Sequence, residues 1–158
     1  MSKQLKVENS DSFALIDDIH FDRLSKFKWF MVESGGIYKN LRKNVLEKHV
    51  SLANSVMQTF DVLYDHKDRD SFNNLESNLR KCTYQQNSFN RKKHKNCSSK
   101  YKGVYWDKKA HNWRSQITID YKTLYIGSFD CEIQAALAYD KKARELFGEF
   151  ANCNFYIT

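Results

Sequence analysis

An aspartate and a histidine stand side by side near the middle of the chain, and two asparagines follow them. Asn78 comes 12 residues after His66, and Asn87 comes 21 residues after it. Asp65 and Asn87 carry oxygen atoms of the kind that Mg²⁺ accepts, and His66 is the side chain that titrates nearest to neutral pH. A metal ligand beside a general base, in a basic chain, predicts metal-assisted hydrolysis of a phosphodiester.

The elements around these residues must bring them together, and the local signals predict a strand, a loop, a second strand and a helix. An apolar run predicts a strand that ends at Asp65, and the polar stretch after it predicts a loop. A second short strand is expected over residues 79–83. Thr83 and Gln86 then match a capping box, which places Asn87 in the first turns of a helix. This order could bring the aspartate, the histidine and both asparagines to one point.

The last third of the chain predicts a small sheet covered by a helix. Three strands are expected over residues 102–106, 113–119 and 122–129, with polar turns between them. Apolar and polar residues alternate in the middle strand, so one face of the sheet is mainly apolar. A helix over residues 131–147, followed by Gly148 at its carboxyl end, can cover that face. The polar face is then left for a ligand.

Other parts of the chain give weaker signals. Residues 13–16 are typical of a short strand, and Asp17 and Asp18 of a turn and a helix start. Residues 45–57 mix strand and helix signals that periodicity alone does not separate.

Positive charge is concentrated in one stretch of the chain. Residues 88–115 hold nine Lys and Arg against one acid, a charge of +8, so the rest of the chain nets −1 of the total of +7. Aromatic side chains lie among these charges, at Tyr101, Tyr105, Trp106 and Trp113. A run of charge is usually only a solvated surface, but basic groups mixed with aromatic groups favour nucleic acid as the partner.

Composition also excludes several classes of protein. The four cysteines form no Cys-x-x-Cys pair, so no structural zinc is expected, and disulfides are not expected in a chain without a secretory signal. No apolar run approaches the roughly 20 residues that a membrane helix requires. We therefore expect a soluble, intracellular protein, in the cytoplasm or nucleoid of a host cell, without a membrane partner.

Two groups of motifs resemble known families, and together they cover nearly the whole chain. Asp65-His66 with Asp70, Asn74, Asn78-Leu79-Arg80 and Gln85-Gln86-Asn87 resembles the core of HNH homing endonucleases of phage or intron type. The last block resembles the Apetala-type DNA-binding domain first known from plant ethylene-response factors. Its markers are Tyr101-Lys102-Gly103-Val104, Trp113-Arg114-x-Gln116-Ile117, Ile126-Gly127-x-Phe129, Ala135-Ala136-x-Ala138-Tyr139-Asp140 and Asn154-Phe155.

The first resemblance implies a role for each residue of the HNH motif. His66 would be the general base that deprotonates the attacking water, and Asn78 would brace the loop and orient it. Asp65 and Asn87 would hold one divalent cation, Mg²⁺ or Mn²⁺, against the scissile phosphate. A positioned base contributes roughly 10²–10⁴-fold to the rate. One such centre cuts one strand, so we expect a monomer to nick and a double-strand break to need a DNA-induced dimer or sequential cuts.

The second resemblance implies that the three-stranded sheet lies in the major groove of double-stranded DNA. The positions that match the family's DNA-contacting residues are Lys102, Tyr105, Arg114, Gln116, Thr118, Thr123 and Tyr125. Arg and Gln can contact the edges of guanine and adenine, respectively. Basic residues ahead of the sheet are expected to follow the phosphates without reading sequence, namely Arg91, Lys92, Lys93 and Lys95.

The expected fold is therefore α+β, with a ββα-metal HNH nuclease core and a three-stranded antiparallel sheet packed on one helix. Residues 1–60 would pack on the nuclease core, residues 61–91 would form it, residues 92–100 would be a basic linker, and residues 101–158 would form the Apetala-type domain.

Two alternatives stay open beside a metal-dependent homing endonuclease. One is a sequence-specific DNA-binding protein or regulator with an impaired nuclease. It is favoured mildly by Ala53-Asn54, at a place where relatives often carry a His-Arg pair. The other is an RNA-binding accessory protein, because charges and aromatic groups would serve RNA equally well. A comparison of duplex DNA and RNA affinity at equal salt concentration would separate these readings.

Overall fold

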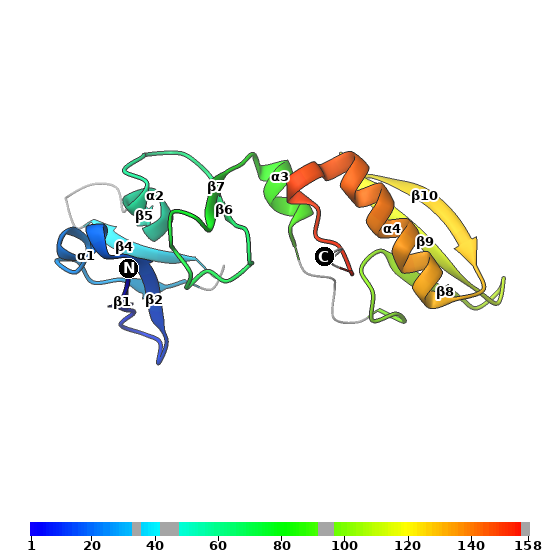
Figure 1. Cartoon of the computed structure of the whole chain (residues 1–158), viewed down its shortest axis with the longest axis horizontal. Helices are drawn as coiled ribbons and strands as arrows, with labels where there is room; N and C mark the ends of the chain where they lie inside the picture. The colour runs from blue at the N-terminus through cyan, green and yellow to red at the C-terminus, as the bar shows by residue number, and fades with distance from the viewer. Residues whose placement is uncertain (33–35, 42–47, 92–96, 156–158) are drawn as a thin grey trace. The chain divides into compact units, whose positions relative to one another are not determined.

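The computed structural model describes residues 1–32, 36–41, 48–91 and 97–155, with the backbone alone at residues 37–41 and 48–49 (Figure 1). The chain divides into two compact units, Met1–Tyr84 and Gln85–Thr158, and each is described by itself. Both units combine small antiparallel sheets with helices. The predicted α+β class is therefore confirmed. None of the described helices is long and apolar enough to cross a membrane.

The first unit begins with a strand pair and continues with a second small sheet. The elements, in order, are β1 (Ser2–Lys6), β2 (Phe13–Asp17), α1 (Asp18–Leu24), β3 (Phe30–Met31), β4 (Ile37–Leu41), β5 (Lys48–Ser51) and α2 (Leu52–Val56). Strand β1 pairs antiparallel with β2, and the order in the second sheet is β3-β4-β5. Ser51 caps α2, because its hydroxyl accepts a hydrogen bond from the backbone nitrogen of Asn54 at 3.1 Å.

A single apolar core holds these elements together. Its largest fully buried side chains are Val7, Ile16, Leu24, Trp29, Leu52 and Val56. The indole nitrogen of Trp29 donates to the carbonyl of Leu24 at 2.9 Å, which satisfies the polar atom of this buried ring. Leu79 belongs to the same core, so the hairpin that carries the candidate site is anchored in it.

The hairpin consists of β6 (Tyr64–His66) and β7 (Leu79–Lys81), joined by a loop over residues 67–78. Helix α3 (Tyr84–Phe89) follows directly. The predicted order of strand, loop, strand and helix is observed. Strand β7 ends at Lys81, two residues earlier than expected, because its partner β6 is only three residues long.

The second unit is built on a three-stranded antiparallel sheet. Strands β8 (Val104–Asp107), β9 (Asn112–Ile119) and β10 (Lys122–Phe129) pair in the order β10-β9-β8, and α4 (Glu132–Phe147) packs against all three (Figure 1). A short 3₁₀ turn, η1 (Gly148–Phe150), follows α4. Ser115 and Ile117 of β9 are buried, as the alternation predicted for the apolar face. Small residues such as Ala135 and Ala136 let α4 approach the sheet closely.

Two glycines are required by the backbone of this unit. Gly103 has a φ of +75°, and a Cβ placed there would lie 2.0 Å from the ring of Tyr139 and 2.7 Å from the carbonyl oxygen of Gln116. Gly148 ends α4 with a φ of +52°, a conformation that glycine adopts without steric cost, and no atom lies within 4 Å of a Cβ there. Only the first position therefore combines an unusual φ with a close approach of a side chain.

The carboxyl-terminal segment closes the unit through one buried carboxylate. Asp140 is fully buried, and its Oδ1 accepts from the backbone nitrogen and the side-chain nitrogen of Asn154 at 2.7 and 3.0 Å. Its Oδ2 accepts from the nitrogen of Phe155 at 2.8 Å. Asn154 in turn bonds both backbone groups of Lys102, so the segment ties the helix to the start of the sheet.

Candidate active site and nucleic-acid interface

Asp65 and His66 lie next to each other on β6. In the register of the hairpin, Asp65 is opposite Arg80 and His66 is opposite Leu79. Neighbouring residues of a strand point to opposite faces, so the carboxylate and the imidazole leave the strand on different sides. Asp65 is 5% exposed, and His66 is half-buried. The expected metal ligand is therefore enclosed by the unit, whereas the expected base keeps contact with solvent.

The carboxylate of Asp65 is paired with the guanidinium of Arg80 across the hairpin. Arg80 Nε donates to Asp65 Oδ2 at 2.8 Å, and Arg80 Nη2 donates to the same oxygen at 2.6 Å. Hydrogen bonds between ionised partners are shorter and stronger than neutral ones. Sequence reasoning did not select Arg80 as a site residue. The register of the hairpin decides which residue lies opposite Asp65, and the motif alone does not give that register.

The imidazole of His66 is held by Asn74. His66 Nε2 lies 3.1 Å from Asn74 Oδ1, and the amide of Asn74 is oriented by its own nitrogen, which donates to Ser71 O at 2.7 Å. Asn74 Oδ1 can then only accept, so Nε2 carries the hydrogen and Nδ1 carries the lone pair of the neutral imidazole. This arrangement sets up His66 to take a proton at Nδ1. Asn74 is part of the motif, but the sequence alone did not identify it as a site residue. Its burial, with 1% of the residue exposed, is visible only in the structure.

Asn78, which was expected to brace the loop and to orient His66, forms three hydrogen bonds within the loop. Its amide nitrogen donates to Asp68 Oδ1 at 2.9 Å and to the carbonyl of Asn73 at 2.7 Å, and its Oδ1 accepts from the nitrogen of Asp68 at 3.1 Å. Burial acts to raise the pKa of Asp68, but the hydrogen bonds from Asp70, Asn78 and Asn73 outweigh it and hold that pKa below its ordinary value. The amide that bonds His66 belongs to Asn74, four residues before Asn78.

The amino-terminal strands hold the same loop from the other side. Leu15 of β2 donates to the carbonyl of Phe72 at 2.7 Å and accepts from the nitrogen of Asn74 at 2.8 Å, as a parallel bridge. Glu76 also belongs to this loop, and its Oε1 accepts a hydrogen bond from Nε2 of the buried His20 side chain at 2.6 Å. The backbone of the residue that orients His66 is thus fixed by β2.

Asn87 lies on α3 and is half-buried. Asp65 and His66 belong to the first unit, and Asn87 belongs to the second. Among the described residues, no three or more His, Cys, Asp or Glu side chains are grouped so that they could hold a metal ion. Asp65 and Asn87 are therefore not brought together within one unit.

Helix α3 is anchored on the second unit through its carboxyl end. The ring of Phe89 stacks on that of Phe147, with 3.7 Å between centroids and 9° between planes. The ammonium of Lys102 donates to the carbonyls of Phe89 and Arg91, both at 2.7 Å, and Asn152 Nδ2 donates to the carbonyl of Arg91 at 2.8 Å. Lys102, expected to contact DNA, therefore uses its charge at the end of this helix, where carbonyl groups lack helical partners.

The polar face of the sheet gathers the other six sheet positions expected to contact DNA. Arg114, Gln116 and Thr118 alternate along β9, and residues directly opposite in an antiparallel pair share a face. The opposite residues are Tyr105 for Arg114, Tyr125 for Gln116 and Thr123 for Thr118. We refer to these six residues as the sheet face: Tyr105, Arg114, Gln116, Thr118, Thr123 and Tyr125.

Arg114 is oriented by two neighbours on the sheet. Its Nε lies 2.8 Å from Asp107 Oδ2, and its guanidinium carbon lies 6.0 Å from the centroid of the Tyr125 ring. Tyr125 is 55% exposed, and its hydroxyl bonds Ser128 Oγ at 2.7 Å. A guanidinium held beside an exposed aromatic ring can present its donors to a base edge.

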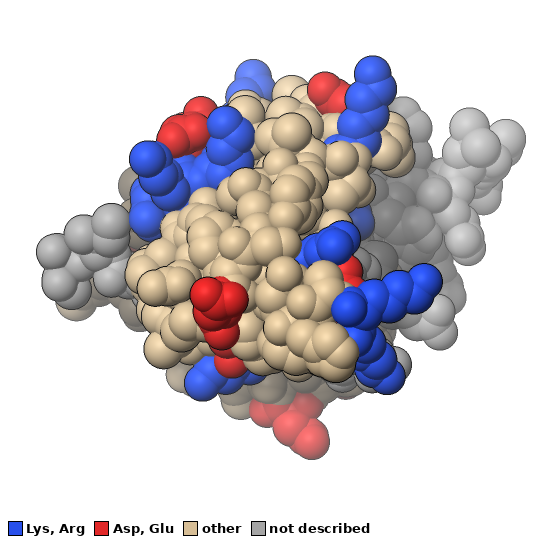
Figure 2. Space-filling model, turned by 90° about the vertical axis from the view of Figure 1, so that its right-hand side faces the viewer, with Lys and Arg blue, Asp and Glu red and all other residues tan. Residues whose placement is uncertain are grey.

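On the face of the molecule drawn in Figure 2, basic side chains lie around the edge of a mostly uncharged surface, with a few acidic side chains among them. Among the basic residues expected to follow phosphates, Arg91 is exposed. Lys92, Lys93 and Lys95 lie outside the described residues. Positive side chains of this kind supply the sequence-independent part of affinity for nucleic acid.

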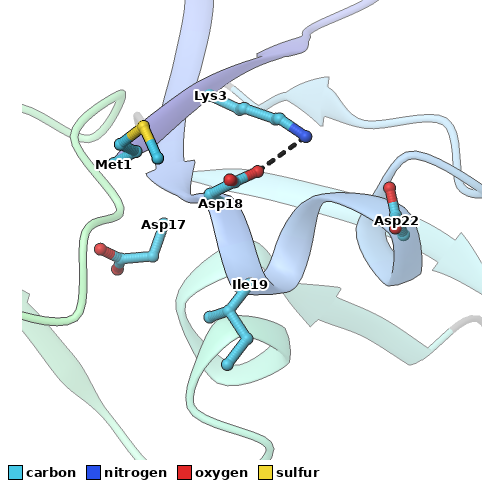
Figure 3. A pocket seen from close by; sticks show the side chains of 6 residues that line it. All are labelled: Met1, Lys3, Asp17, Asp18, Ile19 and Asp22. Carbon is cyan, nitrogen blue, oxygen red and sulfur yellow. Dashed lines mark ion pairs between the residues drawn. The ribbon is translucent and has the colours of Figure 1, made fainter.

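A surface hollow in the first unit is lined by more acidic than basic side chains, unlike a surface that binds nucleic acid (Figure 3). It is lined by Met1, Lys3, Asp17, Asp18, Ile19 and Asp22. Lys3 forms an ion pair with Asp18 at 2.7 Å, and the other two carboxylates keep the hollow negative. Negative charge repels phosphate, so the hairpin with Asp65 and His66 is the better candidate for phosphodiester chemistry.

Comparison with known proteins gives matches to both parts of the chain. The AP2 domain family matches residues 99–149, which include the three-stranded sheet and α4. An uncharacterized HNH endonuclease of Acanthamoeba polyphaga mimivirus is 36% identical over 145 residues, which cover 90% of this chain and 75% of the viral protein.

Shorter matches extend over single parts of the chain. Protein 3.8 of Escherichia phage T7 is 36% identical over 87 residues, 55% of this chain and 71% of the phage protein. An AP2-like ethylene-responsive transcription factor of Arabidopsis thaliana is 40% identical over 60 residues, 38% of this chain and 12% of the plant protein.

Proposed function

Because the chain belongs to the HNH endonuclease family and carries an AP2 domain, we propose that it is a metal-dependent DNA endonuclease of the homing type. The observation that carries this proposal is the Asp65-His66 pair on the hairpin, with the imidazole of His66 oriented by Asn74. In this role the first unit supplies the base for hydrolysis, and the AP2 domain binds the duplex.

His66 acts as the general base. It accepts the proton of the attacking water at Nδ1 while Asn74 keeps the hydrogen on Nε2, so the resulting imidazolium retains its partner. Asn78 keeps the loop closed around Asp68 and thereby holds the segment that carries Asn74. The half-buried position of His66 leaves it open to water, which the reaction requires.

Asp65 and Asn87 are the proposed ligands of one Mg²⁺ or Mn²⁺ ion. This assignment follows the family motif, and it is supported by the chemistry of a carboxylate and an amide oxygen. A cation held there supplies electrostatic stabilisation of the charge that develops on the scissile phosphate. Asp65 contributes a buried carboxylate whose orientation is already fixed by Arg80.

The sheet face is the proposed contact with the major groove of double-stranded DNA. Arg114 and Gln116 lie side by side on β9 with the donors and acceptors that base edges match. The basic residues ahead of the sheet would follow phosphates and fix the orientation of the protein on the duplex. One active centre per chain makes a nick the expected product of a monomer, and two chains on one site would give a double-strand break.

The test is cleavage of supercoiled plasmid by the purified chain in Mg²⁺, Mn²⁺ or EDTA, beside His66→Ala. Nicking that needs the cation and disappears in the variant would establish hydrolysis and its base. A matched control is His111→Asn, because His111 is an exposed histidine at a φ of +51°, which asparagine tolerates. Cleavage that survives His66→Ala would contradict the proposal.

One observation favours the alternative of a DNA-binding protein without nuclease activity. Ala53, at the place where relatives often carry histidine, is 7% exposed and belongs to the apolar core of the first unit. A protein of this kind would shift the mobility of duplex DNA without cutting it under any cation. The plasmid assay and a mobility assay on the same preparation distinguish the two functions.

A further inference from the structure

We infer that Arg80 is a positioning residue for Asp65, which holds the carboxylate in one orientation and balances its charge before a divalent cation binds. The inference rests on the proposed function, because it assumes that Asp65 is a cation ligand. The HNH motif by itself gives Arg80 no such role. It follows from the hairpin register and from the bonds between the two side chains.

The geometry is that of a fixed carboxylate. Two nitrogens of one planar guanidinium address the same oxygen of Asp65, at 2.8 and 2.6 Å. Both side chains are enclosed, with 11% of Arg80 and 5% of Asp65 exposed. A planar group that donates to one oxygen from two positions holds that oxygen in place more closely than a single ammonium would.

Stability alone is a poor explanation for this pair. Replacing a buried ion pair by apolar side chains is often neutral or stabilising, because both ions must be taken out of water. The hairpin is already held by its strand pairing and by Leu79 in the apolar core. An ion pair directly beside His66 is better explained by a need for a charged carboxylate at a fixed place.

The pair has two opposite consequences for a cation at Asp65. The positive charge of Arg80 repels the cation and weakens its binding. The fixed orientation of the carboxylate places the bound cation correctly for the reaction. Removing the guanidinium should therefore change cation affinity and turnover in opposite directions. The cation should bind more tightly, and cleavage should become slower.

The experiment measures binding of Mn²⁺ alone to the full chain by titration calorimetry, together with plasmid cleavage. Arg80→Met should bind Mn²⁺ more tightly than the wild type and cleave roughly 10²-fold more slowly at saturating Mn²⁺. Arg80→Lys keeps the positive charge but lacks the planar guanidinium with its two donors. Its Mn²⁺ affinity should therefore stay near that of the wild type, while its turnover falls. Lys81→Met, which removes an exposed charge from the next residue, should change neither quantity.

Thermal unfolding shows which variants fold, and Arg80→Lys carries the test if Arg80→Met does not. Equal or weaker Mn²⁺ binding in folded Arg80→Met, or unchanged turnover in Arg80→Lys, overturns the inference. Mn²⁺ binding that Asp65→Asn leaves unchanged overturns both the inference and the proposed cation site. If the binding pattern is as expected but the wild type cuts no DNA, the role of Arg80 at the cation stands and the proposed hydrolysis fails.

Discussion

Asn74 accepts the hydrogen of His66 Nε2 through an amide whose other end is bound to Ser71 O. The two residues are eight positions apart, on the hairpin strand and in the loop that follows it. This bond selects the tautomer in which Nδ1 is the basic nitrogen.

Replacing Asn74 should therefore slow cleavage without weakening DNA binding. Asn74→Leu keeps the branched shape of the side chain, at a larger volume, but removes the acceptor, and we expect the single-turnover rate of the folded variant to fall by roughly 10²-fold. Asn9→Ala is the matched control, because it also removes a side-chain bond to a backbone carbonyl of the first unit, that of Met31. A rate for Asn74→Leu equal to that of the control would contradict the assigned tautomer.

Gly103→Ala should unfold the second unit. The new methyl group would lie 2.0 Å from the ring of Tyr139 at a φ of +75°, and we expect a loss of about 3 kcal/mol or more in the free energy of unfolding. Gly148→Ala shares the positive φ without the close contact and should cost about 1 kcal/mol. Urea titration and duplex affinity measure both variants, and equal losses would show that the contact with Tyr139 is unimportant.

Asp68 should make the stability of the first unit depend on acid. Its pKa is held below the ordinary value of 3.8, so its ionised form stabilises the folded state at pH values above 3.8. This stabilisation is lost as the pH falls through the lowered pKa of the folded state. The difference in unfolding free energy between the wild type and Asp68→Asn should therefore shrink as the pH is lowered from 7 toward 3. A difference that is constant over this range would contradict the role of the loop bonds.

Lys102 and Arg114 should respond differently to salt. A side chain that neutralises one phosphate contributes roughly 0.9 to the slope of log affinity against log salt concentration. Lys102→Met should leave this slope unchanged and lower the stability of the second unit, because its ammonium is bound to the carbonyls of Phe89 and Arg91. Arg114→Met should weaken duplex binding with little loss of stability. A smaller salt slope for Lys102→Met than for the wild type would show that Lys102 does contact a phosphate of DNA.

The second unit was the part of the fold most readily predicted from sequence. Its strands alternate with a period of two and are separated by polar turns, so the predicted ranges differ from β8, β9 and β10 by two residues or fewer at each end. The helix expected over residues 131–147 is observed as α4 over Glu132–Phe147. These sequence patterns depend only on neighbouring residues, so they predict the strands and the helix without knowledge of tertiary contacts.

Residues 45–57 gave no clear assignment for a physical reason. This segment contains β5, which ends at Ser51, and α2, which begins at Leu52. Each element is too short for its own periodicity to be read, and Ser51 serves as the last residue of one and the cap of the other.

The partners within the candidate site could not be predicted. Asp65 and His66 are visible in the motif, but the partner of Asp65 depends on the strand register and the partner of His66 on the path of a loop. Lys102 reaches carbonyls 11 and 13 residues away, a contact set by packing in the second unit. Tertiary contacts of this kind leave no periodic trace in the sequence.

The bridge between Leu15 and the loop has a consequence for recombination between such proteins. The nitrogen of Asn74 is fixed by the carbonyl of Leu15, so the residue that orients His66 depends on a strand about fifty positions upstream of the hairpin. An exchange at residue 60 that brought in an amino-terminal segment without an equivalent of β2 would keep the complete HNH motif but remove this support. A functional hybrid therefore needs a strand in the place of β2 that offers these backbone groups to the loop.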